Sequence, residues 1–148
     1  MNTATPASTE QAQIAAVLAT WLRGFLAKDV ATVVSTYTED IVAFDAISQL
    51  RFNGRDAYRV HWEACMAMCP GLPTYEVREQ KIAVSGDLAI VHYLGHCGGT
   101  DAEGNAQGSW SRVTQGLRRE QGRWLIDHEH FSFPIDIASG QAIFDAQP

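Results

Sequence analysis

The sequence predicts a single cone-shaped α+β domain, in which about three N-terminal helices wrap a curved antiparallel or mixed sheet around a pocket. Apolar residues recur at helical spacing through much of the first 70 residues. After Pro73 the pattern changes to strand-like runs separated by short breaks that contain glycine. Helices that precede an antiparallel sheet are typical of α+β domains, and 148 residues is a common size for one such domain.

The charge balance narrows the classes of partner. The chain carries 11 Lys and Arg residues against 17 Asp and Glu, a formal net charge of -6. This balance argues against nucleic acid and against an anionic membrane surface as partners. No apolar stretch approaches the roughly 18 residues needed to span a bilayer, and residues 1–8 lack the pattern of a signal peptide. We therefore expect a cytoplasmic protein.

Three cysteines, Cys65, Cys69 and Cys97, give an odd count without a regular disulfide framework. This usage indicates a reducing compartment. Cys65 and Cys69 are four residues apart in a predicted helix and share one face, where they are interpreted as small buried apolar residues. A metal pair is the alternative, but no second Cys or His pair stands at zinc-ligand spacing.

Two helices are predicted at the start of the domain, after a frayed tail at residues 1–8. The first begins near Glu10, with Ser8 or Thr9 as its cap. Its apolar stripe consists of Ile14, Val17, Leu18, Trp21, Leu22 and Phe25. Asp29 is predicted to cap a shorter second helix, which carries Val33, Val34 and Tyr37.

In the middle of the chain, the spacing of the apolar residues changes twice. Residues 41–45 and 50–52 are short strand-like runs, and the turn signal Asn53-Gly54 follows them. Residues 54–68 return to helical spacing, and Cys69-Pro70-Gly71 ends this third helix.

The remaining chain is predicted to be mostly β-sheet. Four strands are expected at about 74–84, 88–98, 107–119 and 123–133. The breaks at 85–87 and 120–122 have hairpin length, so the strands that they join must be antiparallel. The domain is therefore predicted to cover residues 9–134, and residues 135–148 to form a C-terminal extension.

The last predicted strand is the most informative part of the chain for function. Side chains alternate between the two faces of a strand. One face is predicted to carry Trp124, Ile126, His128, His130 and Ser132. The other is predicted to carry Leu125, Asp127, Glu129, Phe131 and Phe133. The first set grades from bulky apolar to polar along the strand, so we predict that it faces inward, into a cavity shared with Asp45 and Arg112.

The neighbouring predicted strands add further candidates. Trp110, Arg112 and Thr114 share one phase, and so do His92 and His96. A buried arginine needs a carboxylate or a ligand anion as its partner. Trp62, on the predicted third helix, is a candidate to line the wall of the pocket. Each candidate has a structural alternative: core tryptophans, exposed or interface histidines, an arginine in a surface ion pair, and an aspartate that caps a turn.

The order of several short motifs resembles the SnoaL-like, ketosteroid-isomerase-like branch of the NTF2-like superfamily, which has the cystatin-like fold. The segments that carry the resemblance are 25–29 (FLAKD), 37–40 (YTED), 53–57 (NGRDA), 111–114 (SRVT) and 122–132 (GRWLIDHEHFS). The last two are similar to the family's Arg-x-Thr and Trp-x-Ile-x-His-x-His-x-Ser patterns. The resemblance covers roughly residues 10–134, and it implies a deep pocket and a homodimer formed through the outer sheet face.

The resemblance also implies roles for individual residues. The family's catalytic base falls at Asp45, while the two donors of its isomerases fall at Trp21 and Thr114, where the original tyrosine and acid are absent. This loss argues against ketosteroid isomerisation. No cofactor and no metal are expected for this chemistry.

Three functions remain open from the sequence. In the first, Asp45 removes a proton from a small, largely apolar carbonyl compound, while His130 and Arg112 hold or polarise its oxygen. The resulting enolate can lead to isomerisation, dehydration or aldol-type cyclisation. The substrate-binding residues are then Trp21, Trp62, His92, Trp110, Thr114, His128 and Ser132. The second function is a non-catalytic module that binds an apolar or carboxylate ligand, with Arg112 as the anion partner. The third and weakest is a metal site built from His92, His96, His128 and His130.

Overall fold

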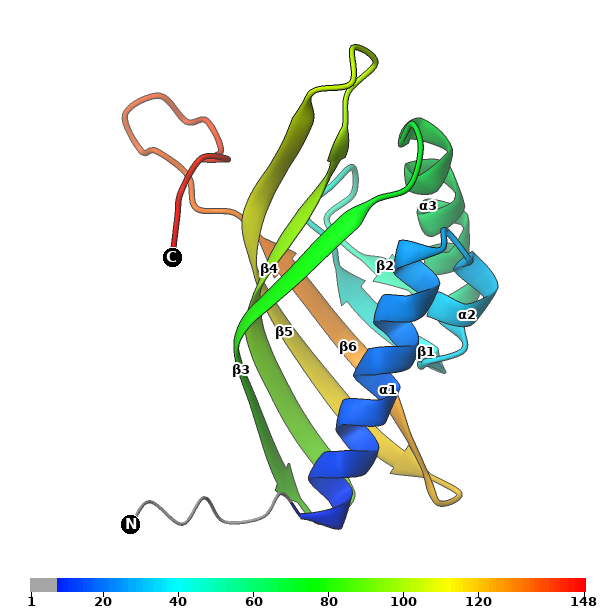
Figure 1. The fold of residues 1–148 in the computed structure, drawn as a ribbon. Coiled ribbons are helices and arrows are strands. Elements are labelled where there is room, and N and C mark those ends of the chain that lie inside the picture. The colour runs from blue at the N-terminus through cyan, green and yellow to red at the C-terminus, as the bar shows by residue number, and fades with distance from the viewer. Residues whose placement is uncertain (1–7) are drawn as a thin grey trace, which may run out of the picture.

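The computed structural model describes residues 8–148 and contains three helices on one side of a six-stranded sheet (Figure 1). The helices are α1 (Thr9–Leu26), α2 (Val30–Val34) and α3 (Arg55–Met68). The strands are β1 (Tyr37–Phe44), β2 (Phe52–Asn53), β3 (Thr74–Ser85), β4 (Leu88–Thr100), β5 (Ala106–Glu120) and β6 (Arg123–Ser132). The predicted order of elements and the α+β class are confirmed. Apart from Ser8, the predicted tail lies outside the described residues.

Local sequence signals explain where the first two helices begin. The Ser8 hydroxyl accepts a hydrogen bond from the Gln11 amide, and the Gln11 side chain accepts one from the Ser8 amide, which makes a capping box. The Asp29 carboxylate accepts a hydrogen bond from the Thr32 amide and caps α2. Both predicted caps are therefore present.

The sheet has the strand order β2-β1-β6-β5-β4-β3. Strands β3 to β6 form an antiparallel meander, as the short breaks between them predict. Strand β1 lies parallel to β6, which makes the sheet mixed. This pairing brings the end of β1 and the last strand together, although they are far apart in the sequence.

A β-bulge in β6 changes which side chains face the helices. Gly116 of β5 is paired with His128, whereas the adjacent Leu117 is paired with Ile126. Asp127 is therefore an extra residue in β6, and the alternation of side chains shifts by one position at this point. Ile126 faces the core before the bulge, and Glu129 faces it after the bulge.

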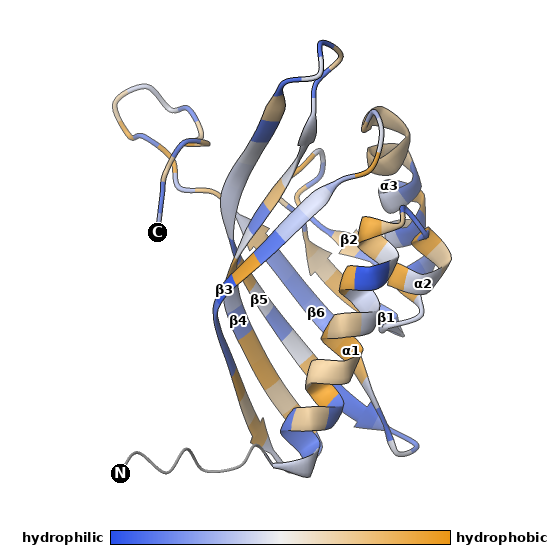
Figure 2. Ribbon diagram, in the orientation of Figure 1, coloured by the Kyte–Doolittle hydropathy of each residue, from blue (hydrophilic) through white to orange (hydrophobic). Residues whose placement is uncertain are grey.

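The core lies between the helices and the inner face of the sheet. The side chains of Ile14, Val33, Tyr37, Ile41 and Tyr58 are fully buried there. Figure 2 shows that apolar residues recur along α1, the helix that lies across the sheet. The opposite sheet face is not covered by helices (Figure 1), and residues 134–148 form a loop that projects away from them. Within residues 8–148, no helix is long and apolar enough to cross a membrane.

Candidate functional site

A cavity of about 260 Å³ with a largely aromatic wall lies between the helices and the inner face of the sheet. Six aromatic residues line it, namely Trp21, Phe25, Trp62, Tyr75, Phe131 and Phe133. They come from α1, α3, β3, β6 and the residue that follows β6, so the cavity forms only when these elements pack together. Its size is at the small end of ligand pockets in proteins.

The aromatic rings pack edge to face and form one continuous wall. The Trp21 ring lies 5.8 Å from the ring of Trp62 and 5.6 Å from that of Tyr75, in T-shaped arrangements. It is also stacked on Phe25 at 5.4 Å. These contacts hold the apolar wall in a fixed shape.

Asp45 supplies the carboxylate that lines this cavity. It follows β1 directly, and its Oδ1 accepts a hydrogen bond from the Ile47 amide at 3.0 Å. Its Oδ2 lies 3.1 Å from the Tyr58 hydroxyl and 3.4 Å from His61 Nε2, both on α3. The Asp45 side chain is only 12% exposed, so it is held in one position at the polar end of the cavity.

Glu129 lies behind Asp45 and is fully buried. Its carboxyl group is contacted by Gln115 Nε2 at 2.7 Å, the Tyr37 hydroxyl at 2.7 Å and the Tyr58 hydroxyl at 3.0 Å. Burial raises the pKa of Glu129 from 4.5 to about 7, although these three hydrogen bonds act in the opposite direction. A neutral and an ionised form of Glu129 are therefore both accessible near neutral pH.

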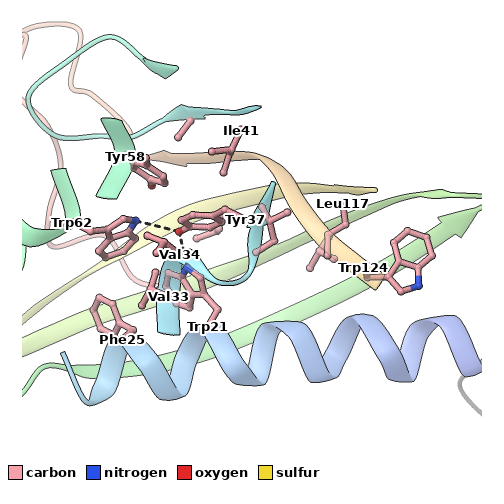
Figure 3. Close-up of a cluster of buried hydrophobic side chains, with 14 of the residues drawn as sticks. Trp21, Phe25, Val33, Val34, Tyr37, Ile41, Tyr58, Trp62, Leu117 and Trp124 are labelled. Carbon is pink, nitrogen blue, oxygen red and sulfur yellow. Dashed lines mark hydrogen bonds between the residues drawn. The ribbon is translucent and has the colours of Figure 1, made fainter. Parts of the chain in front are cut away.

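Tyr37 connects the aromatic wall to Glu129, to which its hydroxyl group donates a hydrogen bond. The Nε1–H groups of Trp21 and Trp62 donate to the Tyr37 oxygen at 2.9 and 3.2 Å (Figure 3). Indole groups only donate, so the Tyr37 hydroxyl must direct its own proton to Glu129. Burial raises the pKa values of Tyr37 and Tyr58 well above their ordinary value, and both remain neutral hydroxyls.

The thiols near the cavity do not form a nucleophilic centre with His61. Cys65 Sγ lies 3.6 Å from His61 Nε2 and 3.9 Å from Nδ1, so the sulfur contacts both ring nitrogens at long distances. A Cys-His-Asp relay requires the thiol and the carboxylate to use different nitrogens, but Nε2 is the nitrogen nearest to Asp45 and also to Cys65. Burial raises the pKa of Cys65, which further disfavours the reactive thiolate.

The predicted association of Asp45 with His130 and Arg112 is wrong. After the bulge in β6, His128, His130 and Ser132 lie on the outer sheet face. His130 and Arg112 are exposed, and Arg112 Nε donates a hydrogen bond to the Ser132 hydroxyl at 3.1 Å. None of these side chains lines the Asp45 cavity. The alternation expected for residues 124–132 failed because it assumed a strand without a bulge.

The other predicted site residues divide between the two sheet faces. Trp21 and Trp62 line the cavity beside Asp45. His92 and Thr114 are paired on the outer face, and Trp110 is covered there by the Arg78 guanidinium at 4.8 Å. The prediction that these three residues line the same cavity is therefore wrong.

The histidines of the outer face do not form a metal centre. His128 Nδ1 lies 2.7 Å from the Val42 carbonyl oxygen, and its ring packs edge-on against Phe44. In the part of the chain that the structure describes, no group of three or more His, Cys, Asp or Glu side chains is placed to hold a metal ion. This arrangement contradicts the metal site considered for His92, His96, His128 and His130.

Sequence reasoning missed Tyr37, Tyr58, His61 and Glu129 as parts of the site. Tyr37 and Tyr58 look like ordinary core residues, and they are also fully buried. A signal existed for Glu129, because this acid alternates with the large apolar residues Phe131 and Phe133 along one strand phase. An acidic residue on an apolar face predicts a buried, hydrogen-bonded carboxyl group.

Comparisons with known proteins agree with this architecture. An NTF2-like protein of unknown function from Pseudomonas putida KT2440 is 37% identical, with a TM-score of 0.89, and the match covers 96% of this chain and 99% of that one. A ketosteroid isomerase-like protein from Erwinia carotovora atroseptica has 23% identity and a TM-score of 0.72, over 85% and 97% of the two chains. A protein of unknown function with a cystatin-like fold from Nostoc punctiforme has 13% identity and a TM-score of 0.70, over 86% and 93%.

A search of curated proteins found no match. The family model of the SnoaL-like domain matches residues 14–136, which is most of the chain. The matched region includes Asp45, Glu129 and the side chains that contact them. The chain therefore belongs to the SnoaL-like domain family, and it has the NTF2-like fold.

Proposed function

We propose that the aromatic cavity binds a small, neutral, largely apolar carbonyl compound, and that Asp45 removes a proton from the carbon next to the carbonyl group. One observation carries this proposal. A single carboxylate, hydrogen-bonded to Tyr58 and Ile47, lies beside His61 at the edge of a cavity whose wall is mostly apolar and aromatic. A fixed carboxylate beside a bound carbonyl compound is the arrangement that enolate chemistry requires.

The charge of the lining selects against an anionic ligand. Among the described residues, Asp45 lines the cavity, and no lysine or arginine does. An anionic carboxylate ligand would therefore have to be buried beside Asp45 without a permanent cation to pair with it. This argument favours a neutral carbonyl compound over the carboxylate ligand that we also considered.

The proposed step uses residues that lie at the cavity. The C–H bond breaks, its proton moves to Asp45, and its electron pair passes into the carbonyl group to form an enolate. His61, which lies beside Asp45, is positioned to interact with the enolate oxygen. The proton then returns from Asp45 to carbon. Return to the same carbon restores the substrate, whereas return to a conjugated carbon completes an isomerisation in which all atoms balance.

Ketosteroid isomerisation itself is not supported by this geometry. The Trp21 indole N–H is already donated to Tyr37, and Thr114 lies on the outer sheet face. Neither can donate to an enolate oxygen in the cavity. The same observation favours a second candidate, a non-catalytic module that binds a small apolar ligand, because enolate chemistry depends strongly on such donors.

Hydrogen–deuterium exchange separates the two candidates. Small cyclic and aromatic ketones would be incubated with the protein in D₂O, and exchange at the carbon next to the carbonyl would be followed by NMR. We expect exchange with the wild-type protein and a loss of about 100-fold or more in D45N, the usual contribution of a general base. Asp56→Asn, an exposed change on α3, is the matched control and should keep the exchange. Thermal stabilisation by a ketone without exchange would instead identify a binding module.

We also propose a homodimer formed through the outer sheet face. Leu88, Ile90 and Phe44 are 61%, 50% and 38% exposed in the single chain. Leu88 and Ile90 belong to β4 and Phe44 to β1. Sedimentation should give a dimer for the wild-type protein and a monomer for Ile90→Asp. Ile137→Asp, a change at an equally apolar but projecting residue, should remain dimeric. A monomeric wild-type protein would rule out this interface.

A further inference from the structure

Asp45 and Glu129 are joined by one tyrosine hydroxyl. Tyr58 Oη lies 3.1 Å from Asp45 Oδ2 and 3.0 Å from Glu129 Oε2. Tyr58 and Glu129 are fully buried, whereas Asp45 lines the cavity. A continuous row of polar atoms therefore runs from the inside of the core to the cavity wall.

The three contacts of this row can all be hydrogen bonds only if the row holds one more proton than the two tyrosine hydroxyls supply. The Tyr37 proton points to Glu129, because the Tyr37 oxygen already accepts from two indole groups. Tyr58 has one proton, but it contacts two carboxyl oxygens. If both carboxyl groups were ionised, one of these two oxygen–oxygen contacts would have no proton and would be repulsive.

We propose that Asp45 and Glu129 act as one unit that shares a single proton through the Tyr58 hydroxyl, with the proton on Glu129 when the cavity is empty. In this state Glu129 donates to Tyr58, and Tyr58 donates to Asp45, which faces the cavity as a carboxylate. Every contact in the row then contains one proton. Moving two protons along the row gives the other form, in which Asp45 is neutral and Glu129 is ionised.

The groups around Glu129 favour the form in which it is neutral. From β1 it faces Tyr37, from β5 Gln115 and from α3 Tyr58, all of which are uncharged. Burial is the main cause of the raised pKa values of Tyr75 on β3 and Tyr93 on β4, and the negative charge of Glu129 raises them further. The negative charge of Asp45 in turn raises the pKa of Glu129.

The surroundings of Asp45 differ from those of Glu129. The Ile47 amide donates to its Oδ1, and His61 Nε2 lies 3.4 Å from its Oδ2. The Ile47 amide and the Tyr58 hydroxyl both offer protons to Asp45, and carboxylate oxygens accept such hydrogen bonds. Among the described residues no lysine or arginine lies in direct contact with either carboxyl group, so the proton itself limits their repulsion.

This inference deepens the proposed function and rests on it only for its catalytic consequence. Tyr58 and Glu129 do not line the cavity, so they are positioning residues that act through Asp45. By holding the shared proton, Glu129 keeps Asp45 ionised and ready to accept a proton from the substrate. After that transfer, Tyr58 links the newly protonated Asp45 to the buried acid.

The sharing can be tested without any substrate. The carboxyl carbons of Asp and Glu would be labelled with ¹³C, and their shifts would be followed by NMR from pH 4 to pH 9 in the full-length protein. We expect one carboxyl signal to titrate near pH 7 and to be absent in E129Q, which assigns it to Glu129. In D45N this midpoint should fall by about one pH unit or more, the size expected for coupled sites.

Tyr58→Phe tests the bridge itself. With phenylalanine at this position, we expect D45N to shift the Glu129 midpoint by less than half as much as it does with tyrosine. A Glu129 midpoint that does not move in D45N, or one far below pH 6, would overturn the proposal even if Tyr58→Phe failed to fold. An equal D45N shift with and without the tyrosine hydroxyl would also overturn it.

An activity measurement separates this inference from the proposed function. If the protein catalyses exchange, its rate should show an inflection near pH 7 that is absent in E129Q. A lack of exchange in all variants would refute the proposed function, while the NMR titration would still decide whether the proton is shared.

Discussion

The unfolding free energy of the wild-type protein, relative to that of E129Q, is expected to fall by roughly 3 kcal/mol between pH 4 and pH 8. The cause is the buried carboxyl group of Glu129, whose pKa is raised from 4.5 to about 7 on folding. Between these two pH values the folded protein binds a proton that the unfolded chain has lost. Stability that depends on this proton is complete below pH 4.5 and disappears as the pH rises through 7.

Glutamine resembles the neutral acid in shape and cannot ionise. E129Q is therefore expected to lack this pH dependence and to gain stability relative to the wild type as the pH rises. The Gln115 side chain can accommodate the new amide by rotation, because its Oε1 has no hydrogen-bond partner among the described residues. The two amides can then pair in place of the present contact between Gln115 and Glu129.

Urea denaturation at a series of pH values would measure the difference between the two proteins. Glu63→Gln is the matched control, since Glu63 is exposed on α3, and its difference from the wild type should stay within about 0.5 kcal/mol. A constant difference between E129Q and the wild type across this range would contradict the raised pKa. So would a change in the opposite direction.

Tyr37→Phe is expected to destabilise the protein by on the order of 3 kcal/mol or more, although it removes a single oxygen atom. That oxygen accepts hydrogen bonds from the indole groups of Trp21 and Trp62, and its proton is donated to Glu129. The substitution leaves two buried N–H donors without a partner, and each costs about 1 to 3 kcal/mol. It also removes one of the hydrogen bonds that lower the pKa of Glu129, which should rise further.

Tyr75→Phe provides the matched comparison, because it removes the same atom, a buried hydroxyl oxygen, from a partly buried tyrosine of the cavity wall. The Tyr75 hydroxyl lies near that of Tyr93, but the two do not form a hydrogen bond of ordinary geometry. We expect this variant to lie within about 1 kcal/mol of the wild type. Thermal and urea denaturation of both variants would test the prediction. Equal losses would show that Tyr37 does not have the special role in the network that its contacts indicate.

Much of the fold could be predicted because its signals are local. Ser8 and Asp29 cap the helices where the sequence places them, and the four long strands occur close to their expected limits. These features depend on the backbone preferences and spacing of residues a few positions apart. Asp45, the catalytic base that the family resemblance implies, lines the cavity between the helices and the sheet.

The candidate site could be predicted only in part, and β6 shows why. A single extra residue at Asp127 turned His128 and His130 to the outer face and Glu129 to the core. Strict alternation has no information about such an irregularity. The bulge becomes evident only from the pairing with β5, where His128 and Ile126 face the adjacent residues Gly116 and Leu117.

The class of the fold, the order of its elements and the caps of its first two helices follow from the sequence, because short-range backbone and burial preferences control them. The meeting of two particular carboxyl groups does not follow from it, because long-range packing brings them together. Asp45 and Glu129 are 84 positions apart and come together because β1 lies parallel to β6 while Tyr58 of α3 packs over both strands. Such a contact depends on the register of strands and the packing of a helix, and no local pattern in the chain encodes either.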